Sequence, residues 1–232
     1  KKDYVGVGDI GCYALGVNTP FNGFDISICM GAGVTNPIGL AEAFKLQGDT
    51  RKVFGILGDS TFYASGIPGL VDVIHNDINA CICILDNSIT AMTGHQENPG
   101  TERGLMGEPL KRMEMLDIIK GMGLDESRIR VVDPINTKEM DAAIEAALAV
   151  TGPFVIVTQS PCILIKEVRK ANAGKYYEID QDKCKKCKAC MKVACPSISN
   201  VNGVITIESS QGTTCGLCVQ MCKFDAIKKV GE

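Results

Sequence analysis

The fold class of this chain is decided by the stretch Lys52-Val-Phe-Gly-Ile-Leu-Gly58-Asp59-Ser60, taken together with Ala80-Cys-Ile-Cys-Ile-Leu-Asp86-Asn87. Each is a short apolar run that ends at a glycine or an acidic residue, which is typical of a strand buried on both faces. Residues 66–76, between the two runs, carry a helical pattern. The order strand, helix, strand predicts two parallel strands of one sheet joined by a crossover helix.

The same alternation continues outward in both directions. Runs rich in Ile, Val and Cys predict further strands at residues 25–30, 129–132 and 154–158, and helical patterns cover residues 34–47, 110–122 and 137–150. We therefore expect an α/β domain over residues 1–170, with a mainly parallel sheet covered by helices on both faces. Ligands of such sheets bind at the carboxyl ends of the strands.

The composition excludes several classes of partner. The 232 residues are 45% hydrophobic and 22% charged, the balance of an ordinary globular protein. No apolar run approaches the ~18 residues that cross a bilayer, so we expect no membrane partner. A net charge of -3 and the absence of Trp argue against nucleic acid.

Cysteine marks a second domain. Seven of the 12 cysteines crowd into residues 184–222, which indicates metal ligation in a reducing cytoplasm more than a disulfide scaffold. Residues 166–175 form a linker or a terminal helix in this interpretation, and residues 176–232 form a small α+β domain. The other cysteines are scattered, and three in or beside predicted strands are expected in the core: Cys29, Cys81 and Cys83.

Two cysteine runs define the chemistry of residues 176–232. The first places three cysteines at intervals of three residues before a Cys-Pro, and the second holds three more: Cys184, Cys187, Cys190 and Cys195-Pro196, then Cys215, Cys218 and Cys222. Such spacing is typical of iron–sulfur ligation. A zinc ribbon, the alternative, needs neither the third cysteine nor the Cys-Pro. The two runs, with the Asp225-Ala-Ile ending of the second, resemble a bacterial-type ferredoxin.

The ferredoxin resemblance implies which cysteines share a cluster. The spacing from Cys218 to Cys222 matches the third and fourth ligands of the family, so the missing ligand is the first and Gly212 stands in its place. One 4Fe–4S cluster is then complete, with Cys184, Cys187, Cys190 and Cys222. The second site, with Cys195, Cys215 and Cys218, is one thiolate short. It holds a 3Fe–4S cluster, holds a 4Fe–4S cluster with an oxygen ligand, or is empty.

Lysines surround the first run. Five lie within ten residues: Lys183, Lys185, Lys186, Lys188 and Lys192. They form a solvated face in one interpretation. In the other, they offset the charge of the cluster and steer an acidic redox partner toward it.

A cofactor motif follows the two strands quoted at the outset. Gly58-Asp59-Ser60 and Asp86-Asn87, separated by residues 61–85, resemble the thiamine diphosphate fingerprint of Gly-Asp-Gly followed by Asn-Asn. Mg²⁺ bridging two phosphates requires oxygen ligands. A carboxylate, an amide and a backbone carbonyl would supply them here, from Asp59, Asn87 and Ile89. Because Ser60 and Asp86 depart from the fingerprint, an ordinary turn and strand end is the alternative.

Neighbouring segments extend the resemblance through both domains. Four segments are similar to those of the 2-oxoacid:ferredoxin oxidoreductases, above all the large subunit of indolepyruvate:ferredoxin oxidoreductases: residues 85–96, residues 58–68, Gly8-Asp-Ile-Gly-Cys12-Tyr13 and Met30-Gly-Ala-Gly33. The resemblance implies oxidative decarboxylation of a 2-oxoacid in anaerobic metabolism, with transfer of the acyl group to coenzyme A and of electrons to ferredoxin. It also implies a gamma-type subunit and a further chain or segment with the pyrimidine-binding domain.

The resemblance implies cofactor contacts at twelve positions: Gly11, Cys12, Gly31, Gly33, Gly58, Asp59, Ser60, Asn87, Ile89, Met92, Thr93 and His95. Glycines 31 and 33 would let backbone N–H groups approach the diphosphate. His95 would contact the diphosphate or the substrate carboxylate. The apolar, adaptable Met92 favours an aryl substrate such as indolepyruvate or phenylpyruvate, with branched-chain 2-oxoacids next.

A third cluster beside the cofactor is also implied by the resemblance. Cys12 and Cys162 match two of its ligands, and the other two would precede Lys1; buried core cysteines are the alternative. Two other classes of function stay open. One is a thiamine enzyme without redox chemistry, in which the cysteine-rich domain has no role. The other is an electron-transfer subunit with a vestigial thiamine site.

Overall fold

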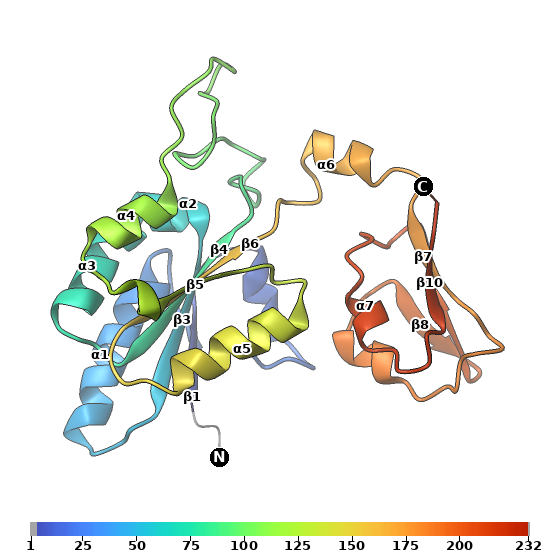
Figure 1. The fold of residues 1–232 in the computed structure, drawn as a ribbon, viewed down its shortest axis with the longest axis horizontal. Coiled ribbons are helices and arrows are strands. Elements are labelled where there is room, and N and C mark those ends of the chain that lie inside the picture. The colour runs from blue at the N-terminus through green and yellow to red at the C-terminus, as the bar shows by residue number, and fades with distance from the viewer. Residues whose placement is uncertain (1–3, 232) are drawn as a thin grey trace. The chain divides into compact units, whose positions relative to one another are not determined.

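The computed structural model describes residues 4–231 and divides the chain into two compact units. The first consists of Lys1–Pro134 with Lys138–Cys162, and the second of Ile135–Thr137 with Ile163–Glu232. None of the described helices is long and apolar enough to span a membrane. Figure 1 shows the helices and strands of each unit.

A six-stranded sheet forms the centre of the first unit. Its order is β2-β1-β3-β4-β6-β5, and every neighbouring pair is parallel. The strands are β1 (Tyr4–Gly8), β2 (Ile26–Ser27), β3 (Lys52–Gly58), β4 (Ala80–Asp86), β5 (Ile129–Val132) and β6 (Phe154–Gln159). The predicted parallel sheet is confirmed. The strand expected at 25–30 is wrong beyond Ser27, and β1 was not predicted because its alternating glycines weaken the apolar pattern.

Helices cover both faces of the sheet, and the alternating side chains of β4 join a core on each face. Ile82 and Ile84 join the core beneath α1 (Ala32–Leu46), α3 (Ile67–His75) and α4 (Met115–Gly121). Cys81 and Cys83 join the core beneath α5 (Thr137–Leu148). Figure 1 shows this division, with α5 on one side of the sheet and α1, α3 and α4 on the other.

Short helical segments complete the first unit. They are the 3-10 turns η1 (Cys12–Val17) and η3 (Glu126–Arg128), the short helix α2 (Asp59–Thr61), and the π-helical turn η2 (Phe62–Gly66) that leads into α3. The helix expected over 110–122 begins only at Met115. The reason is that the preceding residues bond to the long loop after β4: Leu110 N–H donates to Glu102 O and Met113 N–H to Pro99 O.

The second unit contains two small antiparallel sheets. They pair β7 (Tyr176–Ile179) with β10 (Ile227–Val230), and β8 (Ile198–Val201) with β9 (Val204–Ile207). Its helical segments are α6 (Lys166–Ala171), η4 (Ala189–Val193) and α7 (Leu217–Gln220). A small core is built on Cys190, Ile198, Ile205 and Ile227. The expected small α+β domain is confirmed. The helix α6, which precedes the expected start at residue 176, belongs to the same compact unit.

Candidate functional site

The carboxyl ends of β3 and β4 bring the predicted cofactor residues together. Gly58 pairs with Leu85, so Asp59 and Asp86-Asn87 follow directly at the same edge of the sheet. A cavity of about 310 Å³ opens there. Nine of the twelve expected positions line it: Gly11, Cys12, Gly58, Asp59, Ser60, Asn87, Ile89, Met92 and Thr93.

Asp59 is a buried and hydrogen-bonded carboxylate of the cavity. Its side chain is only 4% exposed. Oδ1 accepts a hydrogen bond from Ser60 N at 2.7 Å, and Oδ2 accepts one from Asn98 Nδ2 at 3.1 Å. Burial raises the pKa of the carboxyl, and the charge of Asp86 raises it further against these hydrogen bonds. A buried carboxylate in this setting favours a cation close by.

Asn98 is a residue of this site that the sequence motifs did not reveal. Its amide also donates to Ser60 Oγ at 3.0 Å and accepts from Gly100 N at 2.8 Å. Ser60 Oγ in turn lies 2.7 Å from Thr90 Oγ1. The loop after β4 is therefore fastened over the end of β3 by side chains of both segments.

A tight turn at the end of β4 presents the other two candidate oxygen ligands, the side chain of Asn87 and the carbonyl of Ile89. Asp86 Oδ1 accepts from Ser88 N at 2.9 Å, and Asn87 Oδ1 accepts from Ile89 N at 3.1 Å. Ser88 takes a positive φ of 62°, which reverses the chain direction so that Asn87 and Ile89 both line the cavity.

The residues present fit a magnesium ion with a diphosphate. Carboxylate, amide and backbone carbonyl are the donors that a hard, oxygen-preferring cation takes from a protein, usually together with phosphate oxygens. Asp59, Asn87 and Ile89 offer one of each on a single cavity. The burial and neighbouring charge that raise the pKa of Asp59 would be offset by such an ion.

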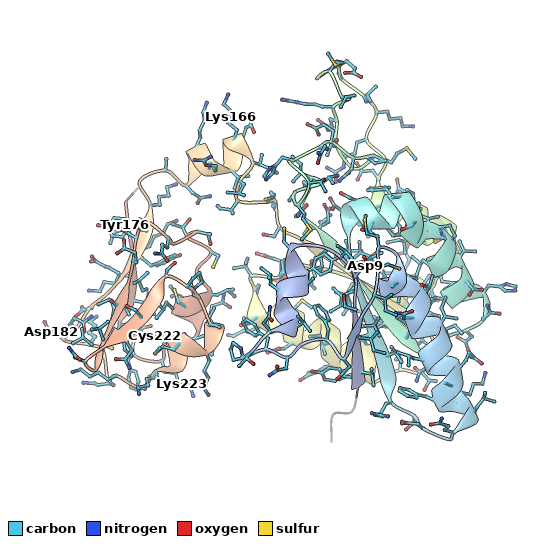
Figure 2. All side chains as sticks on the ribbon, turned by 180° about the vertical axis from the view of Figure 1, so that it is seen from behind. Asp9, Lys166, Tyr176, Asp182, Cys222 and Lys223 are labelled. Carbon is cyan, nitrogen blue, oxygen red and sulfur yellow. The ribbon has the colours of Figure 1, made fainter. Side chains whose placement is uncertain are left out.

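Gly31 and Gly33 have a hydrogen-bond partner that the sequence did not reveal, and their contact with a cofactor stays a prediction. Their N–H groups do not face the cavity but donate to Asp9 Oδ2, at 2.6 Å and 3.2 Å. Asp9 is fully buried beside the start of α1 (Figure 2) and also accepts from Ile10 N. Gly33 is needed for another reason, since a Cβ there would collide with the carbonyl of Ile56 on β3.

Tyr13 belongs to a segment that carries the family resemblance, but the sequence motifs assigned it no role in the site. It lines the cavity, and its hydroxyl accepts a hydrogen bond from Gly58 N at 3.0 Å, directly before Asp59. Burial and the charge of Asp9 raise the pKa of this phenol, so it stays a neutral hydroxyl. The phenol therefore fixes the end of β3 from the side of η1.

His95 and the scattered cysteines lie differently from expectation. His95 does not line the cavity; its Nε2 lies 3.9 Å from Cys162 Sγ. Cys12 lines the cavity whereas Cys162 does not, although Cys162 N–H donates to Asn87 O at 2.9 Å. Cys29 is exposed in the loop after β2, so its assignment to the core is wrong, whereas Cys81 and Cys83 are buried as predicted.

The second unit gathers four thiols around one small cavity, lined by Cys184, Cys187, Cys190 and Cys222. Cys222 lies in the turn after α7 and is labelled in Figure 2. Burial raises the pKa of the Cys190 thiol, and the thiols of Cys184, Cys187 and Cys222 raise it further. These are the four residues that the ferredoxin resemblance assigns to a complete cluster, and thiols are the donors such a cluster takes.

The remaining three thiols form a separate group. Burial raises the pKa of Cys218, and the nearby Cys215 and Cys195 raise it further. In the described part of the chain, no group of His, Cys, Asp or Glu side chains forms a ready site for a single metal ion. The two groups of thiols match the donor sets of two clusters, the second with one thiolate fewer.

Family comparison agrees with this geometry. The model of the thiamine pyrophosphate enzymes, C-terminal TPP binding domain, matches residues 9–158. The chain belongs to this family. A 4Fe-4S dicluster domain matches residues 176–223, so this thiamine pyrophosphate enzyme domain is followed by an iron–sulfur domain.

Curated relatives of this thiamine pyrophosphate enzyme confirm the resemblance to the indolepyruvate oxidoreductases. The protein "Indolepyruvate oxidoreductase subunit IorA" of Archaeoglobus fulgidus is 37% identical over 95% of this chain and 34% of its own length. The protein of that name from Pyrococcus abyssi is 38% identical over 97% of this chain and 36% of its own. The chain thus spans about a third of the length of these relatives.

Solved structures support the fold. The 2-oxoglutarate:ferredoxin oxidoreductase of Magnetococcus marinus aligns with a TM-score of 0.55 and 16% identity, over 94% of this chain and 76% of that one. A thiamin diphosphate-dependent enzyme of Mycobacterium smegmatis aligns with a TM-score of 0.51 and 20% identity, over 70% of this chain and 29% of that one.

Proposed function

We propose that this chain carries the magnesium-diphosphate half of the active site in an oxidoreductase that decarboxylates an aryl 2-oxoacid, indolepyruvate or a close analogue. The products are an acyl-coenzyme A and electrons for ferredoxin. One observation carries the proposal: a cavity with an oxygen donor set for Mg²⁺ and a two-cluster set of thiols belong to the same chain. A thiamine enzyme without redox chemistry has no use for the thiols.

Each part of the cavity has a defined task. Asp59, Asn87 and the carbonyl of Ile89 would hold Mg²⁺ against the diphosphate, while Asn98 and Tyr13 keep the strand ends in place. Thiamine diphosphate, when bound, supplies the carbanion chemistry of decarboxylation, for which the protein provides orientation. The glutamate that activates the cofactor would come from the chain or segment with the pyrimidine-binding domain, which we expect to pair with this one alongside a gamma-type subunit.

The preference for an aryl substrate follows from the walls of the cavity. Five of its lining side chains are large and apolar: Ile10, Met30, Leu85, Ile89 and Met92. Met30 and Met92 are 56% and 55% exposed, so an apolar substrate group that contacted them would also remove their surface from water. Flexible thioether side chains adapt to a bulky ring.

Electrons leave through the second unit in this proposal. Each turnover releases two electrons, and the clusters pass them singly to ferredoxin. The complete 4Fe–4S site is Cys184, Cys187, Cys190 and Cys222, and the second site uses Cys195, Cys215 and Cys218. A third cluster beside the cofactor, with Cys12 and Cys162 among its ligands, stays a prediction.

The test is anaerobic reduction of the clusters by substrate. The complex purified with this chain is mixed with coenzyme A and indolepyruvate, phenylpyruvate, pyruvate or 2-oxoglutarate. We expect bleaching of the iron–sulfur absorbance near 400 nm, on the order of ten-fold faster with the aryl acids, a discrimination within the reach of an apolar pocket. Bleaching by dithionite but by none of the 2-oxoacids would contradict the proposal and favour an electron-transfer subunit with a vestigial thiamine site.

The variant Asp59→Ala is the first prediction from the proposal. Removing the one carboxylate of the donor set should abolish Mg²⁺-dependent binding of thiamine diphosphate. The iron–sulfur clusters of residues 176–232, which we call the tail, should keep their absorbance. Cofactor content per chain, measured after gel filtration, checks this. Asp72→Ala on the exposed part of α3 is the control, since Asp72 bonds only to the neighbouring Asn76. Unchanged cofactor content in Asp59→Ala would refute the assignment.

A further inference from the structure

A buried hydroxyl lies where the second tail site lacks its thiolate. Gly212 stands at the position of the missing ligand. Apart from the adjoining residues, two of the three atoms nearest to a Cβ added there are the backbone oxygens of Ser209 and Glu208. The third, at 3.9 Å, is Ser197 Oγ, the nearest side-chain atom to the place where a cysteine would begin.

Ser197 Oγ has no hydrogen-bond partner although the residue is only 2% exposed. Its backbone is well paired, since Ser197 O accepts from Glu208 N at 2.8 Å. Ser199, two residues later, behaves as serines usually do: it is exposed, and its hydroxyl lies 2.9 Å from Thr206 Oγ1. Buried polar groups are nearly always paired, so the unpaired hydroxyl of Ser197 indicates a partner outside the protein.

The backbone keeps Ser197 beside the second group of thiols. It follows Cys195 by two residues, in a turn closed by the hydrogen bond from Ile198 N to Cys195 O at 3.0 Å. The bond to Glu208 and the next one, from Gln211 N to Glu208 O, fasten this turn to the segment that carries Gly212. The backbone around Ser197 is thus tied to both the Cys195 turn and the Gly212 segment, while the hydroxyl itself stays unpaired.

We propose that Ser197 Oγ ligates the fourth iron of the second tail cluster in place of the thiolate absent at residue 212. The inference rests on the proposed function, in which Cys195, Cys215 and Cys218 hold that cluster. A cysteine Cβ is separated from its iron by one sulfur atom, so an oxygen 3.9 Å from that Cβ lies within reach of an iron that such a cysteine would bind. The Fe–O bond forms as the hydroxyl proton passes to solvent, and no electron is gained or lost.

The ligand assignment makes the second site a 4Fe–4S cluster with three sulfur ligands and one oxygen ligand. Oxygen is a harder ligand than thiolate and favours the more oxidised iron, so this cluster has a different reduction potential from the all-cysteine one. The two clusters of the tail are then electronically distinct, although their peptide segments are related.

Three variants of the full chain test the assignment. Ser197→Ala removes the hydroxyl, Ser199→Ala is the matched control, and Gly212→Cys in the Ser197→Ala background restores a fourth ligand. Gly212 can accept the Cβ, because its neighbours lie at 3.8–3.9 Å. Each protein is reconstituted anaerobically with ⁵⁷Fe²⁺ and sulfide, then oxidised. Iron per chain, electron paramagnetic resonance and Mössbauer spectra are measured.

We expect the wild type and Ser199→Ala to show no 3Fe–4S resonance. Ser197→Ala should lose one iron atom per chain and gain that resonance, and the double variant should recover the iron and lose the resonance. If the second cluster of Ser197→Ala kept all four of its irons, the hydroxyl would be at most a hydrogen-bond donor to the cluster. That result would overturn the ligand assignment. A 3Fe–4S cluster in the wild type would overturn it too. A wild-type tail without any iron would instead refute the iron–sulfur part of the proposed function.

Discussion

At the scale of single residues, the site depends on side chains that orient other side chains. Asn98 shows this most clearly, because its one amide reaches both Asp59 Oδ2 and Ser60 Oγ. Partners that orient a metal ligand are typically worth 10–100-fold in metal affinity. In the proposed function, the loop after β4 would therefore contribute to cofactor binding through a residue that need not touch the cofactor.

Asn98→Ala should weaken Mg²⁺-dependent binding of thiamine diphosphate by roughly 10- to 100-fold without unfolding the chain. Asp59 then loses the donor that fixes Oδ2 and can turn away from the other oxygen donors. Titration calorimetry with the cofactor at saturating Mg²⁺ measures the change. Asn76→Ala removes a similar amide–carboxylate bond on the exposed surface of α3 and serves as the control. Equal affinities of the two variants would contradict the role of Asn98.

The residues that sequence motifs can and cannot reveal differ in a physical way. Asp59, Asn87 and Ile89 follow two adjacent parallel strands, so their meeting could be predicted from strand order alone. Asn98, Tyr13 and Asp9 act through hydrogen bonds between segments whose approach depends on the whole fold. The bonds from the amides of Gly31 and Gly33 to Asp9 could not be predicted for the same reason, because they too join segments that only the fold brings together.

At the scale of elements, the strands were more predictable than the segments that join them. β3, β4, β5 and β6 are apolar runs whose pattern survives any tertiary context. The start of α4 was misplaced because Leu110 and Met113 have a helical pattern but bond to the loop at Glu102 and Pro99. Tertiary hydrogen bonds of this kind override local propensity.

Lys52 connects the start of β3 with the segment that follows α5, at the end of the sheet opposite the cavity. It begins β3 and is 4% exposed, and its Nζ donates to Val150 O at 2.7 Å and Gly152 O at 2.9 Å, just beyond α5. Burial lowers the pKa of this amine to about 8. Keeping this lysine charged below that pH therefore lowers the free energy of unfolding. Its two hydrogen bonds hold the carbonyl groups that follow α5.

The pH dependence of stability follows from that lowered pKa. Between about pH 8 and the ordinary value of 10.5, the unfolded state binds more protons at Lys52 than the folded state, so unfolding becomes harder as pH rises. The free energy of unfolding of the wild type should therefore rise relative to that of Lys52→Met across this window, as urea titrations at several pH values would show. Lys45→Met, at the exposed end of α1, is the control. A difference that is constant with pH would contradict the prediction.

At the scale of the whole molecule, charge is divided unequally between the two parts of the chain. Residues 176–232 contain eight lysines and six acidic residues, whereas residues 1–175 contain 16 basic and 21 acidic residues. Lys185 and Lys188 line the cavity of the complete cysteine set, and the neighbouring Phe224 is 44% exposed. An exposed aromatic ring among cationic side chains has the composition of a docking surface for an acidic protein.

Electron transfer to an acidic ferredoxin should therefore weaken with salt. Screening over a Debye length of about 10 Å at 0.1 M reduces the attraction, so the second-order rate of ferredoxin reduction by the dithionite-reduced protein should fall as ionic strength rises. Lys185→Glu with Lys188→Glu should slow the reaction on the order of ten-fold at low salt and remove the salt dependence.

The control for that prediction carries the same change in charge elsewhere. Lys166→Glu with Lys170→Glu on α6 should leave the rate within about two-fold of the wild type, because these charges do not line the cluster cavity. Acidic groups beside the cluster make it a stronger electron donor, so a slower rate in the first pair cannot come from driving force. Equal slowing by both pairs would show that only the overall charge matters.

Asp9 has a consequence for how the protein is supplied in the cell. The positive end of a helix commonly receives a phosphate, but in α1 the amides of Gly31 and Gly33 are already taken by the chain's own carboxylate. In the proposed function, the negative charge of the diphosphate would then be neutralised mainly by the cation at Asp59. If that proposal holds, we expect thiamine abundance alone to leave the site unfilled, so that magnesium shortage would keep the protein empty while the vitamin was plentiful.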